Sequence, residues 1–226
     1  KKMSKIMKKF TLSLGLFFIL ATSNFTQVYA ADKPMGHSNF EIIKIKTKMG
    51  FESSSAYFDG KSDKVVIFVP GAIFNKESWF FLAERLQQLN VASLSLDGKR
   101  KEDVLSAIKI LKEKGFAKII LVGASMGGGS VLHALEEKID DSIDKVIVLA
   151  PYGGSAIKSK KINKLFVIAE DDRLGIYPKV KKIYTNSADP KKMVEYEGAE
   201  HAQHLFKSSH KDELSELIID FINGDN

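Results

Sequence analysis

The feature that most constrains the fold is a glycine-rich turn between an apolar run and a helix-compatible segment. The run Lys118-Ile119-Ile120-Leu121-Val122 has the pattern of a buried strand and leads into Gly123-Ala124-Ser125-Met126-Gly127, after which Gly128 to Lys138 favours a helix. A sharp turn of this kind packs against the strand and the helix at once, so side chains at its two flanking glycines would collide with them. The stretch therefore predicts a strand, a strained turn with Ser125 at its tip, and a helix.

A serine at the tip of such a turn is typical of a nucleophile, but the pentapeptide alone fits a second interpretation. The turn Gly127-Gly128-Gly129-Ser130 also suits a phosphate group bound at a helix N-terminus. That alternative is disfavoured because the lysine and the Ser/Thr arrangement of a P-loop are missing. It also leaves unexplained an acid and a histidine that lie further along the chain.

Two later segments carry that acid and that histidine, and each follows a predicted strand. Leu165 to Ala169 is a buried-strand pattern that ends in Glu170-Asp171-Asp172. Met193 to Tyr196 reads as a short strand, followed by a loop that contains His201. The carboxyl ends of strands form the ligand-binding edge of an open α/β sheet. The chain order is therefore serine, acid, histidine, which is the order given for α/β-hydrolases.

At these three segments the sequence resembles the α/β-hydrolase superfamily, and the resemblance covers nearly all of the chain after the first forty residues. Val65 to Pro70 with Gly71-Ala72 looks like the family's third strand and its His-Gly-x oxyanion turn, although Pro70 stands where a histidine is usual. The expected helix at Phe80 to Leu89 and the strand at Val91 to Leu96 repeat the family's next unit. The resemblance implies an α/β fold with a mostly parallel central sheet of about eight strands.

The resemblance also implies a role for each site residue. His201 is the base that activates Ser125, because an alcohol is a poor nucleophile at neutral pH. Asp172 orients the imidazole and stabilises the imidazolium that forms. The backbone N–H groups of Met126, which follows the nucleophile, and of Ala72, in the turn after the third strand, are expected to bind the developing oxyanion.

Two of these assignments have a competitor in the sequence. Asp171 is the alternative acid, but the family places the acid three positions after the small residue that ends the strand, which selects Asp172. His204 is the alternative base, but His201 follows Gly198 in the way of the family's Gly-x-x-His turn, so we interpret His204 as a surface or supporting residue. No cluster of histidines and carboxylates has the spacing of a metal site, and no cofactor is implied.

The N-terminal residues have the pattern of a secretory signal. Lys8-Lys9 precede the apolar stretch Phe10 to Ala21, and Val28-Tyr29-Ala30 offers small residues at the positions that a signal peptidase reads. We therefore expect a signal segment at residues 1–30 and a flexible leader at 31–39, in a protein that a bacterial cell secretes. An uncleaved segment that tethers the protein to the membrane is the alternative.

The remaining residues, 40–226, are predicted to form one α/β-hydrolase domain. Its first strands, Glu41 to Lys48 and Ser54 to Phe58, are expected to form a hairpin at the sheet edge. Strands and helices then alternate, which argues for a mostly parallel sheet covered by helices on both faces. Only a short loop fits between Ala150 and Lys164, where many relatives insert a cap. The pocket is therefore expected to be open.

The formal net charge of +6 does not indicate a nucleic-acid partner. Residues 1–30 hold five of the 34 basic residues and none of the 28 acidic residues, so the rest of the chain carries 29 basic against 28 acidic side chains. We interpret the lysine runs at Lys158 to Lys164 and Lys179 to Lys182 as solvated faces. The alternative is weak association with an anionic cell wall or membrane surface. The chain has no cysteine, which excludes a disulfide scaffold.

Together these patterns predict a serine hydrolase, most simply a carboxylesterase that acts on small-molecule or surface-borne esters. Met126, Ile73, Phe74 and Tyr152 either line its acyl pocket or serve only in packing. A peptidase or an acyltransferase fits the same triad. A catalytically inactive hydrolase-like domain that binds a ligand or partner is the alternative outside enzymes. Nothing in the sequence indicates the oligomeric state.

Overall fold

The computed structural model describes residues 39–137 and 140–224. The chain divides into residues 1–36 and residues 37–226, and the described residues all belong to the second part. The predicted signal segment, and all of the predicted leader except Asn39, lie outside the described residues. None of the helices in the described part is both long enough and apolar enough to cross a membrane.

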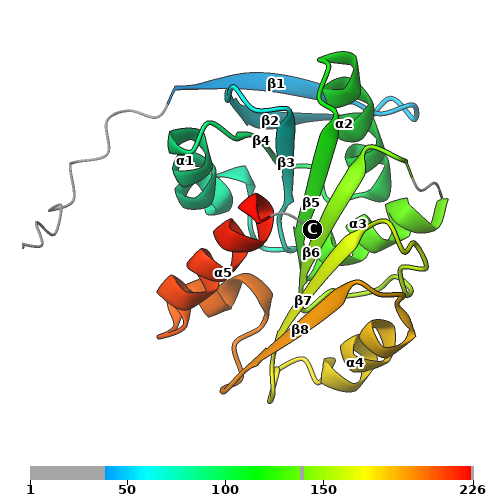
Figure 1. Cartoon of the computed structure of the whole chain (residues 1–226), viewed down its shortest axis with the longest axis vertical. Helices are drawn as coiled ribbons and strands as arrows, with labels where there is room; N and C mark the ends of the chain where they lie inside the picture. The colour runs from blue at the N-terminus through cyan, green and yellow to red at the C-terminus, as the bar shows by residue number, and fades with distance from the viewer. Residues whose placement is uncertain (1–38, 138–139, 225–226) are drawn as a thin grey trace, which may run out of the picture. The chain divides into compact units, whose positions relative to one another are not determined.

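An eight-stranded sheet forms the centre of the fold (Figure 1). Its strands are β1 (Phe40–Lys46), β2 (Glu52–Phe58), β3 (Lys64–Val69), β4 (Ala92–Leu96), β5 (Lys118–Ala124), β6 (Ile143–Leu149), β7 (Asn163–Ala169) and β8 (Lys191–Tyr196). They lie in the order β1-β2-β4-β3-β5-β6-β7-β8, and only the β1–β2 and β2–β4 pairs are antiparallel. The predicted mostly parallel sheet and the hairpin at its edge are confirmed.

The central strands are continuous apolar runs because both faces of the sheet are covered. Every residue from Val65 to Val69 in β3 and from Ile119 to Ala124 in β5 is buried. Parallel strands that are buried on both faces read as near-continuous runs of hydrophobic residues, without the alternation of a half-exposed strand. This burial explains why the sequence alone locates these strands.

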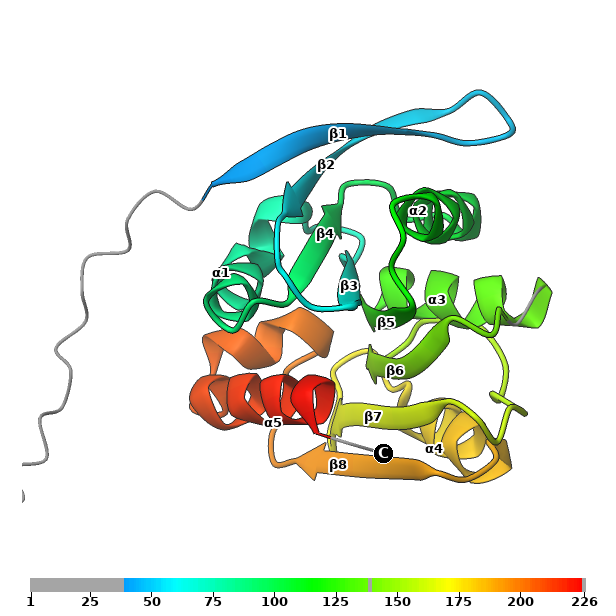
Figure 2. The ribbon, with the colours of Figure 1, turned by 45° about the horizontal axis from the view of Figure 1, so that its top comes forward.

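Five α-helices and two short 3₁₀-helices complete the described fold. The α-helices are α1 (Phe80–Gln88), α2 (Lys101–Glu113), α3 (Met126–Glu137), α4 (Tyr177–Asn186) and α5 (Lys211–Asn223), and the 3₁₀-helices are η1 (Lys76–Trp79) and η2 (Ala202–Lys207). Figure 2 shows α1 and α5 on one face of the sheet and α2, α3 and α4 on the other. Helices on both faces are confirmed. Residues 150–162 connect β6 to β7 without a helix or strand, so the expected absence of a cap domain in this connection agrees with the described structure.

The helix α4 is missing from the sequence-based prediction, which interpreted its lysines only as a solvated face. Val180 and Ile183 are buried, while Lys179, Lys181 and Lys182 are exposed. Apolar residues three positions apart lie on one side of a helix, so the lysines fall on the other side. The prediction that Lys179 to Lys182 form a solvated face is therefore confirmed for these lysines, and the face belongs to an amphipathic helix that covers β7.

Lys164 contradicts the prediction that the run from Lys158 to Lys164 is a solvated face. Its side chain is fully buried at the start of β7, and its Nζ donates to the carbonyl oxygens of Ser159, at 2.7 Å, and Ile162. Burial lowers the pKa of Lys164. The loop before β7 folds back over this ammonium group, so the lysine satisfies carbonyl oxygens that would otherwise be buried without a partner.

An aromatic cluster packs between β3 and the two 3₁₀-helices. The ring of Trp79 stacks on Phe68 with centroids 5.1 Å apart and meets the ring of Phe206 edge-on at 5.8 Å. Phe206 also meets Phe81 edge-on at 5.1 Å. Each such pair contributes about 0.5–1.5 kcal/mol beyond the burial of its area. The cluster therefore fixes the loop after β3 relative to the loop after β8, which carries His201.

Asp140 connects the start of β6 to α2. Its Oδ2 lies 2.6 Å from Lys112 Nζ, and its Oδ1 accepts hydrogen bonds from the N–H and Oγ of Ser142 at 3.0 and 2.7 Å. Burial opposes ionisation of this carboxyl, but the bonds from Lys112 and Ser142 outweigh it and lower its pKa to about 2. Such a carboxylate stabilises the fold above its unfolded pKa of about 3.9, and the contribution is lost as the pH falls toward 2.

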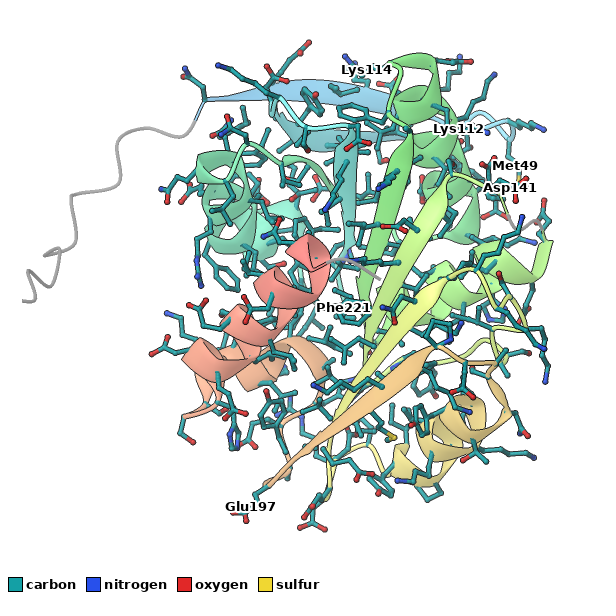
Figure 3. The ribbon with its side chains drawn as sticks, viewed as in Figure 1. Met49, Lys112, Lys114, Asp141, Glu197 and Phe221 are labelled. Carbon is teal, nitrogen blue, oxygen red and sulfur yellow. The ribbon has the colours of Figure 1, made fainter. Side chains whose placement is uncertain are left out.

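We expect Asp140→Asn to lower the free energy of unfolding by about 1 kcal/mol at pH 6, because the partly exposed pair is screened by solvent. The difference from the wild type should shrink as the pH falls from about 4 to about 2, where the wild-type carboxylate becomes protonated. Urea unfolding at a series of pH values measures both effects. Asp141→Asn is the matched control, since Asp141 pairs with Lys161 in full exposure (Lys112 and Asp141 are labelled in Figure 3). Equal effects of the two substitutions would contradict the prediction.

Candidate active site

Ser125 lies at the turn between β5 and α3 with a backbone φ of 50°. This left-handed conformation strains a residue that carries a Cβ, and it persists only where the surroundings hold it. The Ser125 N–H donates to Leu149 O at 2.9 Å, and its carbonyl oxygen accepts hydrogen bonds from the N–H groups of Gly129 at 2.9 Å and Tyr152 at 2.8 Å. The end of β6, the first turn of α3 and the loop after β6 thus hold the serine together.

The glycines that flank Ser125 allow α3 to approach the sheet closely. A Cβ on Gly127 would lie 2.3 Å from Val69 O and 2.5 Å from Pro70 O. A Cβ on Gly123 would lie 2.8 Å from Gly127 O. These separations are shorter than any contact a real Cβ makes, so both positions exclude a side chain. The predicted collision at the two flanking positions is confirmed.

The structure brings together the three side chains that the sequence predicts as a triad. His201 Nδ1 lies 2.7 Å from Asp172 Oδ2, and His201 Nε2 lies 2.7 Å from Ser125 Oγ. An ionised carboxylate only accepts hydrogen bonds, so Nδ1 carries the proton and Nε2 is free to accept the serine proton. The histidine and aspartate side chains are almost completely buried. The geometry therefore suits proton transfer from Ser125 to His201.

Asp172, and not Asp171, is the acid that meets the histidine. The N–H of Asp172 donates to Ala169 O at 3.2 Å, and its Oδ1 accepts a hydrogen bond from the Leu174 N–H at 3.0 Å. The second carboxylate oxygen is thereby left for His201. Asp171 is exposed, and its N–H donates to Gly198 O at 3.1 Å. The turn after β7 thus orients one of the two acids inward and the other outward.

His204 lies beside the site without entering the triad. Its ring meets the ring of Phe74 edge-on at a centroid distance of 5.2 Å. Burial lowers the pKa of His204, and the positive charges of Arg173 and Lys207 lower it further. The neutral ring therefore serves as an aromatic contact for the loop that follows β3.

The loop after β3 holds the first predicted oxyanion donor. Gly71 to Phe74 form a turn in which the Phe74 N–H donates to Gly71 O at 3.0 Å. A Cβ on Gly71 would lie 3.4 Å from Ser125 Cβ, so the turn passes directly beside Ser125. Ala72 is exposed. Within residues 39–137 and 140–224 no acceptor is bound to its N–H, which is therefore free for a ligand.

The second predicted donor is the N–H of Met126, the first residue of α3. The first N–H groups of an α-helix have no partner within the helix. In the part of the chain that the structure describes, no side chain or loop carbonyl accepts a hydrogen bond from the Met126 N–H either. The positive end of the helix macrodipole favours a negative charge at the same position.

Sequence reasoning missed two polar groups that support the site. Gln203 is buried, and its Oε1 accepts a hydrogen bond from the Gly71 N–H at 2.7 Å. Asp97, at the end of β4, accepts hydrogen bonds from the Lys76 N–H at 2.8 Å and from Lys76 Nζ at 2.6 Å, and so holds the segment after the oxyanion turn. A glutamine two residues after the predicted base carries no periodic signal in the sequence. Only the folded chain reveals its partner.

Four exposed apolar residues are linked through the backbone to the predicted triad or to the predicted oxyanion turn. Ile73 is 81% exposed, Tyr152 60%, Leu174 53% and Met126 44%. Each is adjacent in the chain, or hydrogen-bonded through its backbone, to a residue of the triad or of the oxyanion turn. Of the residues predicted as an acyl pocket or as packing, Ile73, Met126 and Tyr152 are therefore exposed, and Phe74 is half-buried. We refer to Ile73, Met126, Tyr152 and Leu174 as the apolar rim.

No protein-family model matches the chain, and no curated protein matches it. Many solved structures share its fold. An esterase from Pyrococcus furiosus is 17% identical over 82% of this chain and 94% of that chain, with a TM-score of 0.66. A putative hydrolase from Agrobacterium vitis is 14% identical over 82% of this chain and 100% of that chain, with a TM-score of 0.67. A monoacylglycerol lipase from Paleococcus ferrophilus is 14% identical over 76% of this chain and 98% of that chain, with a TM-score of 0.64.

These structures define the class of the fold. At identities this low the likeness concerns the fold, and the chain has the α/β-hydrolase fold, as the sequence predicted. The strand order, the mostly parallel pairing and the helices on both faces of the sheet agree with that fold.

We expect Gly127→Ala to destabilise the fold by about 3 kcal/mol or more, because the added Cβ meets backbone oxygens that cannot move aside independently. Gly175→Ala is the matched control. Gly175 also sits at a tight turn, with a φ of 62°, but a Cβ there has nothing within 4 Å. It should cost only about 1 kcal/mol, the penalty of the left-handed conformation. Urea unfolding of both variants measures the difference, and similar midpoints would show that close packing at Gly127 is not required.

Proposed function

We propose that the protein is a serine hydrolase that cleaves carboxylic esters through an acyl-enzyme on Ser125. The observation that carries the proposal is the unbroken hydrogen-bonded chain from Asp172 through His201 to Ser125, with both bonds at 2.7 Å. The free N–H groups of Met126 and Ala72 beside the serine support it. The likeness to solved esterases and a lipase supports a hydrolase of this fold.

Acylation begins when Ser125 Oγ bonds to the ester carbonyl carbon and His201 Nε2 takes the serine proton. The electron pair of the carbonyl π bond moves to the carbonyl oxygen, and the N–H groups of Met126 and Ala72 bind the resulting oxyanion. Asp172 stabilises the imidazolium through Nδ1–H. When the carbonyl forms again, the bond to the alcohol oxygen breaks and His201 gives that oxygen its proton. The alcohol leaves, and the acyl group stays on Ser125.

Deacylation repeats these steps with water as the nucleophile. His201 takes a proton from the water as its oxygen bonds to the acyl carbon, and the same N–H groups bind the second oxyanion. Collapse of this intermediate breaks the bond to Ser125 Oγ, which recovers its proton from His201. The carboxylic acid is released, and the triad returns to its starting state.

The apolar rim favours an ester with an apolar group that remains accessible to solvent. Ile73, Met126, Tyr152 and Leu174 are exposed apolar residues next to, or bonded through the backbone to, the triad or the oxyanion turn. Residues 150–162, where a cap would be inserted, form a short irregular connection. A site without a lid does not enclose a long acyl chain. We therefore propose short-chain or surface-borne esters as substrates, and secretion of the enzyme by means of the signal predicted at residues 1–30.

We expect a fluorophosphonate probe to label the purified wild-type protein at Ser125, with the labelled peptide identified by mass spectrometry. Ser125→Ala should abolish labelling and reduce ester turnover by about five to six orders of magnitude, because the triad acts as a unit. Circular dichroism of the variant controls for folding. A folded wild-type protein that takes no label would contradict the proposal and favour a hydrolase-like binding domain. Labelling without turnover of aryl esters would instead direct the search to peptides or acyl acceptors.

Asp172→Asn should reduce ester turnover by about four orders of magnitude, because the amide favours the wrong tautomer of His201. Asp171→Asn is the matched control and should leave turnover within about twofold, since exposed substitutions away from the site have small effects. Initial rates with a chromogenic short-chain ester measure both variants. A collapse of activity in the Asp171 variant, with Asp172→Asn active, would reassign the acid.

A further inference from the structure

A buried glutamine side chain connects the loop of the proposed base to the proposed oxyanion turn. Gln203 is only 3% exposed. Its Oε1 accepts the hydrogen bond from the Gly71 N–H at 2.7 Å, and its Nε2 donates to Ser78 Oγ at 2.8 Å. Ser78 Oγ in turn donates to Asn75 O at 2.5 Å. One amide group therefore joins η2 to the start of the turn and to η1.

The contact lies at the point that sets the direction of the Ala72 N–H. Gly71 is the first residue of the turn, and the bond from the Phe74 N–H to Gly71 O fixes its last residue. Gln203 thus holds the peptide unit that precedes the Gly71 Cα, and the bond from Phe74 holds the unit that follows it, which carries the Ala72 N–H. An oxyanion donor is effective only where its direction is fixed before the charge develops. The amide of Gln203 supplies that constraint from outside the turn.

The chain reaches this position through a strained backbone. Ala202, between the histidine and the glutamine, has a φ of 50°. A left-handed residue at this point allows His201 to meet Ser125 while Gln203 meets Gly71, although the two side chains are only two positions apart. Strain of this kind costs about 1–3 kcal/mol and persists where the surroundings hold it. The base and the turn are thereby fixed by the same short segment.

We propose that Gln203 is a positioning residue that orients the Ala72 N–H toward the developing oxyanion. The inference rests on the proposed serine hydrolase function. The side chain must accept a hydrogen bond from Gly71 and donate one to Ser78, and a neutral amide does both. A leucine does neither. An ionised glutamate accepts but does not donate, and it brings a negative charge close to the site of the oxyanion.

The first test is Gln203→Leu, measured with an aryl ester after titration of active sites with a fluorophosphonate. We expect kcat to fall by about 10²-fold or more with KM within about threefold, the pattern of a lost oxyanion donor. The inhibition constant of a boronic acid, whose tetrahedral adduct imitates the intermediate, should rise in the same proportion. Gln87→Leu is the matched control, because Gln87 on α1 donates to Asn39 O and Asp59 O. It should leave kcat per titrated site unchanged.

A second variant separates positioning from folding. In Gln203→Glu, protonation of the carboxyl restores a donor and removes the charge. The ratio of its kcat/KM to that of the wild type should therefore rise as the pH falls from 8 to 5, a change that lost stability alone does not produce. If Gln203→Leu fails to fold, this profile decides the question.

The outcomes are distinct. A wild-type protein that neither labels nor turns over ester overturns the proposed function, and this inference with it. An active wild type with Gln203→Leu at full kcat per site overturns only the positioning role. The same holds if kcat falls while the boronic acid binds as before, or if the Gln203→Glu ratio does not change with pH.

Discussion

The close packing of α3 against the end of β3 is the contact on which the rest of the site depends. Gly127 brings the helix so near that a single Cβ would overlap the carbonyl oxygens of Val69 and Pro70. This approach places Ser125 beside the turn at Gly71, and the helix begins at the next residue, Met126. Ser125 and both candidate oxyanion donors therefore take their positions from one backbone contact, because Gly127 has no side chain between the helix and the strand.

The elements that the sequence predicts correctly are those whose pattern is local. β5 and β7 are apolar runs because both faces of the sheet are covered. Since the two strands run parallel, the residues that follow them lie at the same carboxyl edge of the sheet. The order of Ser125, Asp172 and His201 along the chain resembles that of α/β-hydrolases and therefore predicts that their side chains meet. The structure brings these side chains within hydrogen-bond distance. The predicted hairpin of β1 and β2 also forms, with bounds that differ from the prediction by at most two residues.

The features that escaped prediction depend on partners distant in the chain or on a fold already formed. Lys164 belongs to a lysine run and reads as solvated, yet its ammonium group is enclosed by carbonyl oxygens of the preceding loop. The helix α4 carries only two buried apolar residues, too few to stand out from its lysines. Gln203 lies 132 positions after Gly71 in the sequence, so no local pattern indicates the hydrogen bond between them.

Residues 150–162 reach over the edge of the sheet and are held at separate points. The Tyr152 N–H is bound to Ser125 O, and at Ile157 the N–H and the carbonyl oxygen are bound to Ser187 Oγ and the Ala188 N–H. Chain inserted between these anchors leaves both in place. The entropic cost of a longer loop grows only logarithmically, by about 0.6 kcal/mol for each doubling of its length. The domain is therefore a scaffold into which evolution or engineering can insert a lid over the proposed active site without moving Ser125, Asp172 or His201.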